Sequence, residues 1–243
     1  ESDVTVENGN IESVQQVTDH RWQAIFTPTD DIEDATNVII AGYDWTDTAG
    51  NAPLGPTNSF NYKIDTLEPT LNSIVLSDTK LKAGETTTVT FTFSEETVGF
   101  TLDDLTVRNG SLSDLNATTD TMVYTATFTP TEDVEDATNV ITERGYTSIT
   151  WTDLVGNRPA NDDAISLNYE VDTRNPNLTV TSADTTSGLS GTSEAGAAIS
   201  VTITDPSGTS RTLNATADDT NTGAWNISSA DILGSEVTSE DNG

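Results

Sequence analysis

WTDTAGN at residues 45–51 returns as WTDLVGN at residues 151–157, and the stretches around both copies recur as well. The other matching pairs are FNYKIDT at 60–66 with LNYEVDT at 167–173, and FTPTDDIEDATNVI at 26–39 with FTPTEDVEDATNVI at 128–141. The copies are offset by 102 residues (26 to 128), 106 (45 to 151) and 107 (65 to 172). Solenoid repeats have periods of about 20–50 residues, so this unit is a whole domain that occurs twice.

Strand patterns dominate the chain, and no segment has the apolar periodicity of a helix. In TTVTFTF at 87–93, apolar residues alternate with threonine, as in a strand with one buried face. The second repeat is predicted to contain these strands: 70–76, 86–93, 105–108, 111–115, 123–129, 140–151 and 165–171. About seven strands in about a hundred residues are typical of an immunoglobulin-like β-sandwich. The Asn-Gly pairs at 8–9 and 109–110 predict hairpin turns.

The predicted fold class is therefore all-β, with tandem immunoglobulin-like β-sandwich domains in a rod-like array. Residues 1–65 are expected to form a partial domain without its first two strands, because nothing before VTVENG at 4–9 matches 70–93. Residues 66–172 form a complete domain, and residues 173–243 form a domain of a second subtype without its closing strands. The first and last domains are thus expected to be truncated and to have open sheet edges.

The charge balance excludes several classes of partner. With 40 acidic side chains against 9 lysines and arginines, the formal net charge is −31 at pH 7. Nucleic acids and anionic membrane surfaces repel such a chain. The absence of cysteine excludes disulfides and thiolate metal sites, and it favours an extracellular bacterial protein, surface-bound or secreted. No apolar run reaches membrane-spanning length, and no signal peptide is visible.

Several motifs resemble a known family in their order and spacing. AGE at 83–85, FTFSE at 91–95, DLTV at 104–107 and the Thr-Asp-x-x-Gly-Asn loop look like the bacterial Ig-like repeats of large biofilm adhesins, mostly type-I-secreted, RTX-type proteins. GTSEAG at 191–196 is similar to a second Ig-like subtype of the same proteins. The resemblance implies an extender that supports cell adhesion and biofilm formation, often stiffened by calcium at its domain junctions.

Carboxylates are expected to converge where one sandwich meets the next, because linker, bottom loop and top loops meet there. The linkers supply Asp65 and Asp172. The bottom and top loops supply the other predicted metal ligands: Glu33, Asp34, Glu135, Asp136, Glu95, Asp153, Asn157 and Glu194. Carboxylates crowded together repel one another and favour a bound cation. Calcium fits, since it takes about six to eight oxygen ligands. Zinc prefers cysteine and histidine ligands, and this chain has no cysteine and a single histidine, His20.

Structural interpretations compete with metal binding at some of these positions. Asp47 either binds metal or caps the backbone of a tight turn, and the acidic bottom loops are either ligands or solvated turns. Aromatic residues at repeated positions are predicted to form the sandwich core: Trp45, Trp151, Tyr62, Tyr169 and, in the third domain, Trp225. No Ser-His-Asp set, phosphate loop or histidine pair is present, so the chain is not predicted to be an enzyme.

Three functions are compatible with these features. The first is a structural extender of a bacterial surface adhesin, with calcium between neighbouring repeats of the chain. The second is a ligand-binding Ig-like module that recognises a glycan or a host protein through exposed aromatic or loop residues. The third is a subunit of a surface filament in which incomplete domains of different chains complete each other by strand donation. None of the three involves nucleic acid or direct membrane insertion.

Overall fold

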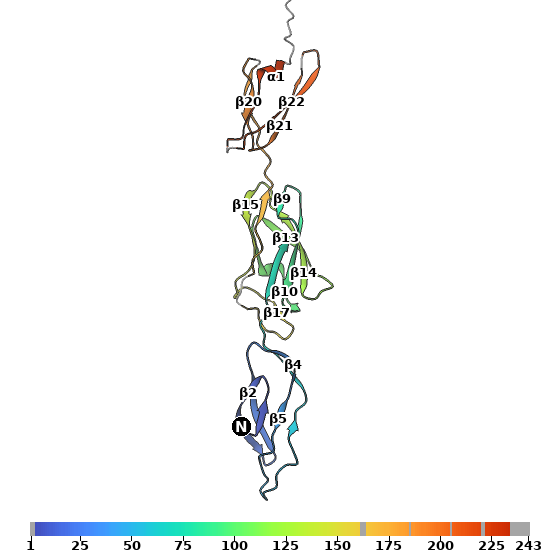
Figure 1. Ribbon diagram of the computed structural model, residues 1–243, viewed down its shortest axis with the longest axis vertical. Helices are drawn as coiled ribbons and strands as arrows, with labels where there is room; N and C mark the ends of the chain where they lie inside the picture. Colours follow the sequence, from blue (N-terminus) through green and yellow to red (C-terminus); the bar gives the residue numbers. More distant parts are fainter. Residues whose placement is uncertain (1–2, 161–163, 185, 205, 220–221, 234–243) are drawn as a thin grey trace, which may run out of the picture. The chain divides into compact units, whose positions relative to one another are not determined.

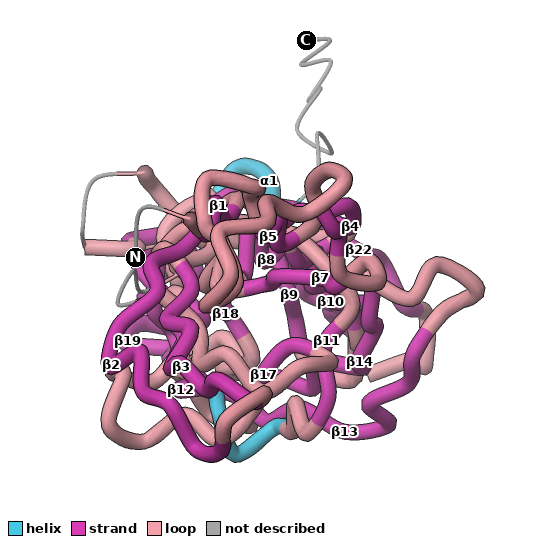
Figure 2. Tube along the Cα trace, turned by 90° about the horizontal axis from the view of Figure 1, so that it is seen from below, coloured by secondary structure: helices cyan, strands magenta, loops and turns pink. Residues whose placement is uncertain are grey.

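The computed structural model describes residues 3–160, 164–184, 186–204, 206–219 and 222–233. The chain forms two compact units, Glu1–Thr173 and Arg174–Gly243. Strands make up 52% of the chain and helices 4%, which confirms the all-β prediction. Figure 2 shows the same balance, with strands and loops throughout and helix confined to short stretches. Among the described residues, no helix is long and apolar enough to cross a membrane.

The second repeat has two groups of strands. The first group is one four-stranded sheet in the order β13-β14-β10-β8: β8 Leu71–Leu76, β10 Thr87–Phe93, β13 Gly110–Ala117 and β14 Val123–Pro130. The second group contains β15-β18-β9, β12-β16 and β11-β17: β9 Lys80–Lys82, β11 Thr97–Val98, β12 Leu105–Val107, β15 Glu135–Asn139, β16 Ile141–Glu143, β17 Thr152–Asp153 and β18 Tyr169–Asp172. The short 3-10 helix η1, Leu102–Asp104, leads into β12. Figure 1 shows this repeat with β9 and β15 near one end, β17 near the other, and β10, β13 and β14 between them.

Aromatic side chains hold the two groups of strands together, as expected for a sandwich without cysteine. Phe93 on β10 packs edge-on against Trp151, with ring centroids 5.0 Å apart. Phe128 on β14 packs in the same way against Tyr169 on β18, at 5.1 Å. All four residues are buried. Trp151 and Tyr169 are therefore core residues, as predicted.

Two details of the second repeat differ from the sequence prediction. Asn109-Gly110 does turn the chain, with Asn109 at a φ of 47°, but it joins β12 to β13, which lie in different sheets. The turn is a crossing between sheets and not a hairpin, because the Asn109 side chain bonds to the second sheet, at Asp136 and Asn139. The strand predicted at 140–151 is also interrupted. Within that range only β16 is a strand; turns follow it, and the next strand, β17, begins at Thr152.

Among residues 3–65, the first repeat contains counterparts of β12 to β16 and of β18, but none of β8 to β11 and none of β17. Its strands are β1 Val4–Val6, β2 Gly9–Thr18, β3 Arg21–Pro28, β4 Glu33–Asn37, β5 Ile39–Ala41, β6 Thr57–Asn58 and β7 Tyr62–Asp65. They form three small sheets, β1-β5-β6, β2-β3 and β4-β7. Only Asn37 and Ile64 are buried among the described residues of this repeat. The prediction that Trp45 is core is wrong: its side chain is 51% exposed, because among the described residues no strand packs on it as β10 packs on Trp151.

The second unit has its own small core. Its elements are β19 Thr179–Asp184, β20 Gly188–Thr192, β21 Ala198–Thr204, β22 Ser210–Thr216, β23 Ala224–Ile227 and the short helix α1 Ser229–Leu233. They form the sheets β19-β20-β23 and β21-β22. Trp225 is buried with Ile199, Ala217 and Ile227, which confirms it as a core residue.

Candidate metal centre

Asp65 ends β7 and lies directly opposite Glu33 in the antiparallel β4–β7 pair. The acidic segment predicted as a bottom loop thus begins strand β4. Two carboxylates directly opposite each other in a ladder destabilise it. The next residue, Thr66, fixes the chain at this point. Its hydroxyl donates to the carbonyl of Thr29 at 2.7 Å and accepts from the backbone N–H of Ile32 at 3.1 Å.

Asp153 belongs to the Thr-Asp-x-x-Gly-Asn loop of the second repeat and is 1% exposed. Its Oδ1 accepts the backbone N–H groups of Val155, Gly156 and Asn157 at 2.6–2.9 Å. The Asn157 amide donates to Asp153 Oδ2 at 2.7 Å and to the backbone carbonyl of Asp65 at 3.1 Å. The loop therefore fixes its own carboxylate and holds the end of the first repeat as well.

The loop of the first repeat has nearly the same geometry around Asp47. Asp47 Oδ1 accepts the backbone N–H of Asn51 at 2.8 Å, and Oδ2 accepts the Asn51 amide at 2.9 Å. These hydrogen bonds from Asn51 lower the pKa of Asp47. The turn interpretation of the motif is thus correct for both copies, and in the second copy the turn also presents a carboxylate to the linker.

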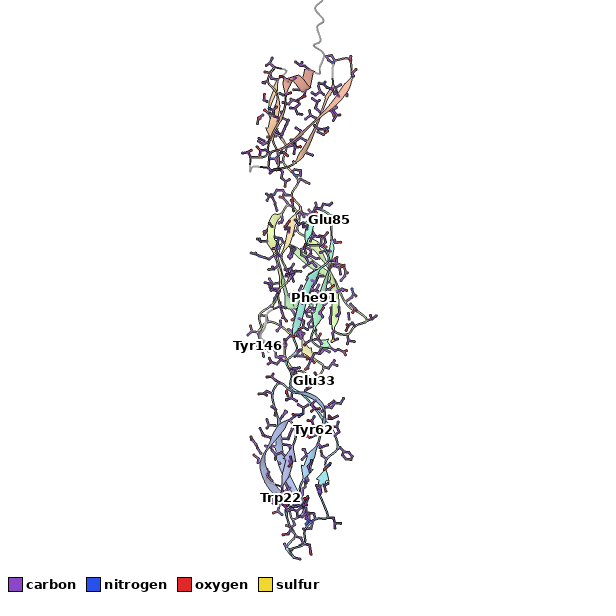
Figure 3. The ribbon with its side chains drawn as sticks, in the orientation of Figure 1. Trp22, Glu33, Tyr62, Glu85, Phe91 and Tyr146 are labelled. Carbon is purple, nitrogen blue, oxygen red and sulfur yellow. The ribbon has the colours of Figure 1, made fainter. Side chains whose placement is uncertain are left out.

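Glu95 follows β10 and completes the group. Burial raises the pKa of its carboxyl above the usual value, and the negative charges of Asp65, Asp153 and Glu33 raise it further. Glu33 is thus close enough to act on the group, as its position opposite Asp65 requires. Figure 3 labels Glu33 at the end of its repeat. Four acidic side chains from four segments of the chain therefore share one region.

Asp65, Glu95 and Asp153 each offer a carboxylate oxygen, and these three oxygens lie within 4.8 Å of one another. Two oxygens bound to one Ca²⁺ at about 2.4 Å lie at most about 4.8 Å apart, so the spacing fits a common ion. Thr97 lies opposite Asp153 in the β11–β17 pair, and its buried hydroxyl oxygen has no hydrogen-bond partner. Side chains directly opposite in an antiparallel pair lie on the same face, so Thr97 offers a further oxygen on the side of Asp153.

The remaining predicted ligands lie elsewhere. Asp34 and Asp136 use their carboxylates locally: each accepts the backbone N–H two residues on, from Thr36 or Thr138, at 2.9 Å. They also accept the amides of Asn8 and Asn109, and these contacts lower the pKa of both aspartates, the backbone N–H groups most of all.

The end of the second repeat has the same acidic pair as the end of the first. Glu135 lies opposite Asp172 in β15–β18, as Glu33 lies opposite Asp65. Asp172 is exposed. Glu194 is half-buried and belongs to the second unit, where its backbone carbonyl accepts the N–H of Ala197 at 3.1 Å. Metal binding by Glu135, Asp172 and Glu194 stays a prediction.

Sequence reasoning missed the residues that hold the acidic segments in place. Thr173 repeats the contacts of Thr66, donating to the carbonyl of Thr131 at 2.7 Å. Asn139 is fully buried; its amide donates to the carbonyls of Asp136 and Tyr169, and its oxygen accepts from Asn109 at 2.6 Å. The signal was present in the sequence, because each of these residues has an identical counterpart in the first repeat.

Comparison with known proteins agrees with this architecture. The family described as bacterial Ig-like domain matches residues 1–64 and again residues 65–171. The two matches cover most of the chain, so the protein belongs to the bacterial Ig-like domain family. Such domains are modules of surface-exposed proteins and generally serve structural or binding roles. No curated protein and no solved structure gives a significant match.

Proposed function

We propose that this chain is an extender segment of a bacterial cell-surface adhesin, in which calcium bound by Asp65, Glu95 and Asp153 stiffens the junction between two Ig-like repeats. The observation that carries the proposal is the position of this group. One carboxylate comes from the last strand of the first repeat, and two come from the second repeat, from the turn after β10 and from the end of β17. A cation bound to all three would tie one repeat to the next.

The polypeptide around the group supports this role. Asn157 holds the carbonyl of Asp65, and Ala160 donates its backbone N–H to the carbonyl of Pro69 at 3.0 Å. The linker is therefore attached to the second repeat on both sides of its short length. A cation would add to these contacts by neutralising carboxylates that otherwise repel one another. Extracellular calcium modules bind at about 0.1–1 mM, a range that suits a surface protein.

The exposed aromatic residues do not favour the glycan-binding alternative. Trp22 and Trp45 are the most obvious stacking platforms, at 64% and 51% exposed. Their counterparts in the second repeat are Tyr124 and Trp151, which pack against Phe93 inside the sandwich. The two tryptophans thus occupy core positions that are open in the first repeat. An extender role accounts for the repeat and the acidic group together.

Calorimetric titration with calcium and thermal unfolding with and without a chelator test the proposal. We expect calcium to bind and to raise the unfolding temperature of the parent chain. We also expect it to increase the maximum particle dimension measured by small-angle X-ray scattering. Glu95→Gln should abolish the tightest binding event, because it removes one of the three carboxylate ligands. Among the described residues Glu95 accepts no backbone hydrogen bond, so the substitution should leave the fold intact. Glu96→Gln, the same charge change at an exposed neighbour, is the matched control and should bind as the parent does. Equal unfolding temperatures in calcium and in chelator would refute the metal centre.

A further inference from the structure

The Asn-Gly pair at residues 109–110 is required by the structure at both of its positions. Asn109 has a left-handed φ of 47°, which asparagine tolerates better than most residues. A Cβ added at Gly110 would lie 2.2 Å from the ring of Phe128, so the close approach of β13 to β14 requires glycine there. This dipeptide is chemically labile, because glycine leaves its backbone N–H unhindered beside a thermolabile asparagine side chain. The fold therefore depends on a bond sequence that can react with itself.

The side-chain amide of Asn109 is anchored in the second group of strands. It donates to Asp136 Oδ2 at 2.8 Å and to Asn139 Oδ1 at 2.6 Å. The pKa of Asp136 is lowered, first by the backbone N–H of Thr138 and also by Asn109, so its carboxylate is ionised at neutral pH and can only accept. The Asn139 amide donates to the carbonyls of Asp136 and Tyr169, which leaves its oxygen for Asn109. Both partners of Asn109 are thus acceptors that need its N–H groups.

We propose that Asn109-Gly110 is a deamidation site that the folded second repeat protects and that unfolding opens, and that the modified chain cannot regain the native turn. In this reaction the backbone nitrogen of Gly110 attacks the side-chain Cγ of Asn109. The new N–Cγ bond closes a succinimide ring while the bond from Cγ to the amide nitrogen breaks. That nitrogen leaves as ammonia and takes up the proton from the Gly110 nitrogen. Water then adds to one of the two ring carbonyls and opens the ring to aspartate or isoaspartate.

The contacts of Asn109 oppose the first step in the folded repeat. Ring closure moves the Asn109 Cγ onto the Gly110 nitrogen, so the amide must leave both Asp136 and Asn139. One of the two hydrogen bonds that break is made to a charged group, and such bonds are the stronger kind. We therefore expect the folded repeat to slow the reaction by at least about tenfold.

The same contacts reject both products. Aspartate at position 109 would place a second carboxylate within hydrogen-bond distance of Asp136, where like charges repel. The oxygen of Asn139, which is fully buried, would lose its donor as well. Isoaspartate also lengthens the main chain by one carbon, which disturbs the register in which Gly110 lies opposite Pro130. A repeat that stays unfolded long enough would thus be marked and kept from refolding.

The first test compares the full chain kept folded in buffer with the same chain kept in urea, at one temperature and mildly alkaline pH. Peptide mapping by mass spectrometry follows Asn109 separately from the other asparagines, and enzymatic methylation scores isoaspartate. We expect Asn109 to deamidate at least about tenfold faster in urea. A synthetic peptide of residues 106–113 controls for urea itself and should react equally in both solvents. Equal rates for the full chain in both solvents would overturn the proposal.

The second test dilutes the chain from urea after increasing times and measures amide hydrogen exchange in β14. The fraction of chains that regain protection should fall as Asn109 deamidates. Asn109→Asp should lose protection without any incubation, whereas Asn116→Asp, the same change at an exposed side chain of β13, should refold as the parent does. Equal refolding of these two variants would contradict the proposal.

Asn109→Gly separates deamidation from other damage in urea. Glycine tolerates the left-handed backbone and has no side-chain amide to lose. Whatever fraction of this variant folds at the start, that fraction should not decline with time in urea. A decline that matches that of the parent chain would show that another reaction blocks refolding, and the proposal would be wrong.

Discussion

Two pairs of acidic residues lie directly opposite each other in antiparallel strand pairs, where their negative charges repel. Glu33 faces Asp65 across two strands, and Glu135 faces Asp172 in the same way. Like charges directly opposite in a ladder are destabilising, and salt screens them most where they are exposed, as at Glu33, Glu135 and Asp172. Both pairs stand where the chain leaves a repeat. A bound cation would convert this repulsion into attraction, so the pairs are expected to make stability depend on cations.

Glu95→Gln should stabilise the metal-free protein at neutral pH. The folded-state pKa of Glu95 is raised above its usual value of 4.5, so protonation favours the folded state. This contribution is complete below the unfolded pKa and is lost as pH rises through the raised folded pKa. Removing the charge should therefore add about 0.5–1 kcal/mol above that pKa, after allowing for screening. Chemical denaturation in chelator across a pH series measures it.

The control for this substitution is the same series in calcium. Because Glu95 is a proposed ligand, the parent should become more stable than Glu95→Gln once calcium is added. Below the raised pKa of Glu95 the two proteins should converge, since the parent side chain is then protonated as well. A difference that is the same at every pH, with and without calcium, would show that the carboxylate charge is not responsible.

Asn139→Ala should destabilise the second repeat by about 2–4 kcal/mol, because it leaves buried partners without hydrogen bonds. The lost contacts are those to Asn109 and to the carbonyls of Asp136 and Tyr169. Urea denaturation measures the change. Asn116→Ala on β13 is the comparison, since Asn116 is exposed and its loss should cost less than about 0.5 kcal/mol. Equal effects would show that the buried amide adds nothing beyond its surface counterpart.

At the scale of elements, each repeat has a glycine where β2 or β13 begins. A Cβ at Gly110 would collide with the ring of Phe128, and a Cβ at Gly9 would collide with the ring of Phe26. Phe128 is fully buried and cannot move aside, whereas Phe26 is only half-buried. The added Cβ would thus meet a ring that is held on all sides in the second repeat and a ring that is partly free in the first.

Gly110→Ala should therefore cost about 1–3 kcal/mol, which is typical of overpacking in a dense core, and Gly9→Ala should cost less than half of that. Denaturant unfolding of the two variants makes the comparison, and circular dichroism of the folded forms controls for local rearrangement. If both substitutions cost the same, the half-covered state of the first repeat would be in doubt.

The strands could be predicted from sequence where alternation is strong. Thr87–Phe93 forms a strand with Val89, Phe91 and Phe93 inward, as its pattern indicates. The Asn-Gly turns could not be assigned correctly, because local preference does not say which sheet the next strand joins. In the structure the chain crosses from one sheet to another at Asn109 and at Asn8. The side chains of these residues donate hydrogen bonds to the buried asparagines Asn139 and Asn37. Tertiary contacts decide this outcome.

Part of the candidate site could also be predicted. Asp65, Glu95 and Asp153 were expected at one junction because linker and top loops meet there, and the structure brings their oxygens together. Asp34 and Asp136 look equivalent in sequence, yet their carboxylates are used by backbone N–H groups two residues on. One carboxylate can either cap a turn or face a junction, and strand register decides which. Register is set by pairing partners far away in the sequence.

At the scale of the whole molecule, the repeats should differ in local stability. The larger core cluster lies between Leu71 and Val171, while residues 3–65 contribute only Asn37 and Ile64 to the buried residues. Buried apolar area sets the free energy of local opening. We expect amides of β2 and β3 to exchange with solvent faster than those of β10 and β14, by at least about tenfold. Hydrogen exchange followed by mass spectrometry measures it, and slower exchange in β3 than in β14 would contradict this assignment.

One further consequence comes from the parallel pair of β9 and β18. Lys80, Leu81 and Lys82 lie beside Glu170, Val171 and Asp172, and both strands run in the same direction. A tensile load on the two ends of the chain pulls β9 toward its N-terminal end and β18 toward its C-terminal end, which are opposite directions along the parallel pair. The hydrogen bonds between them are then sheared together instead of being peeled apart one after another. A sandwich closed in this way is suited to bearing mechanical force along the polypeptide.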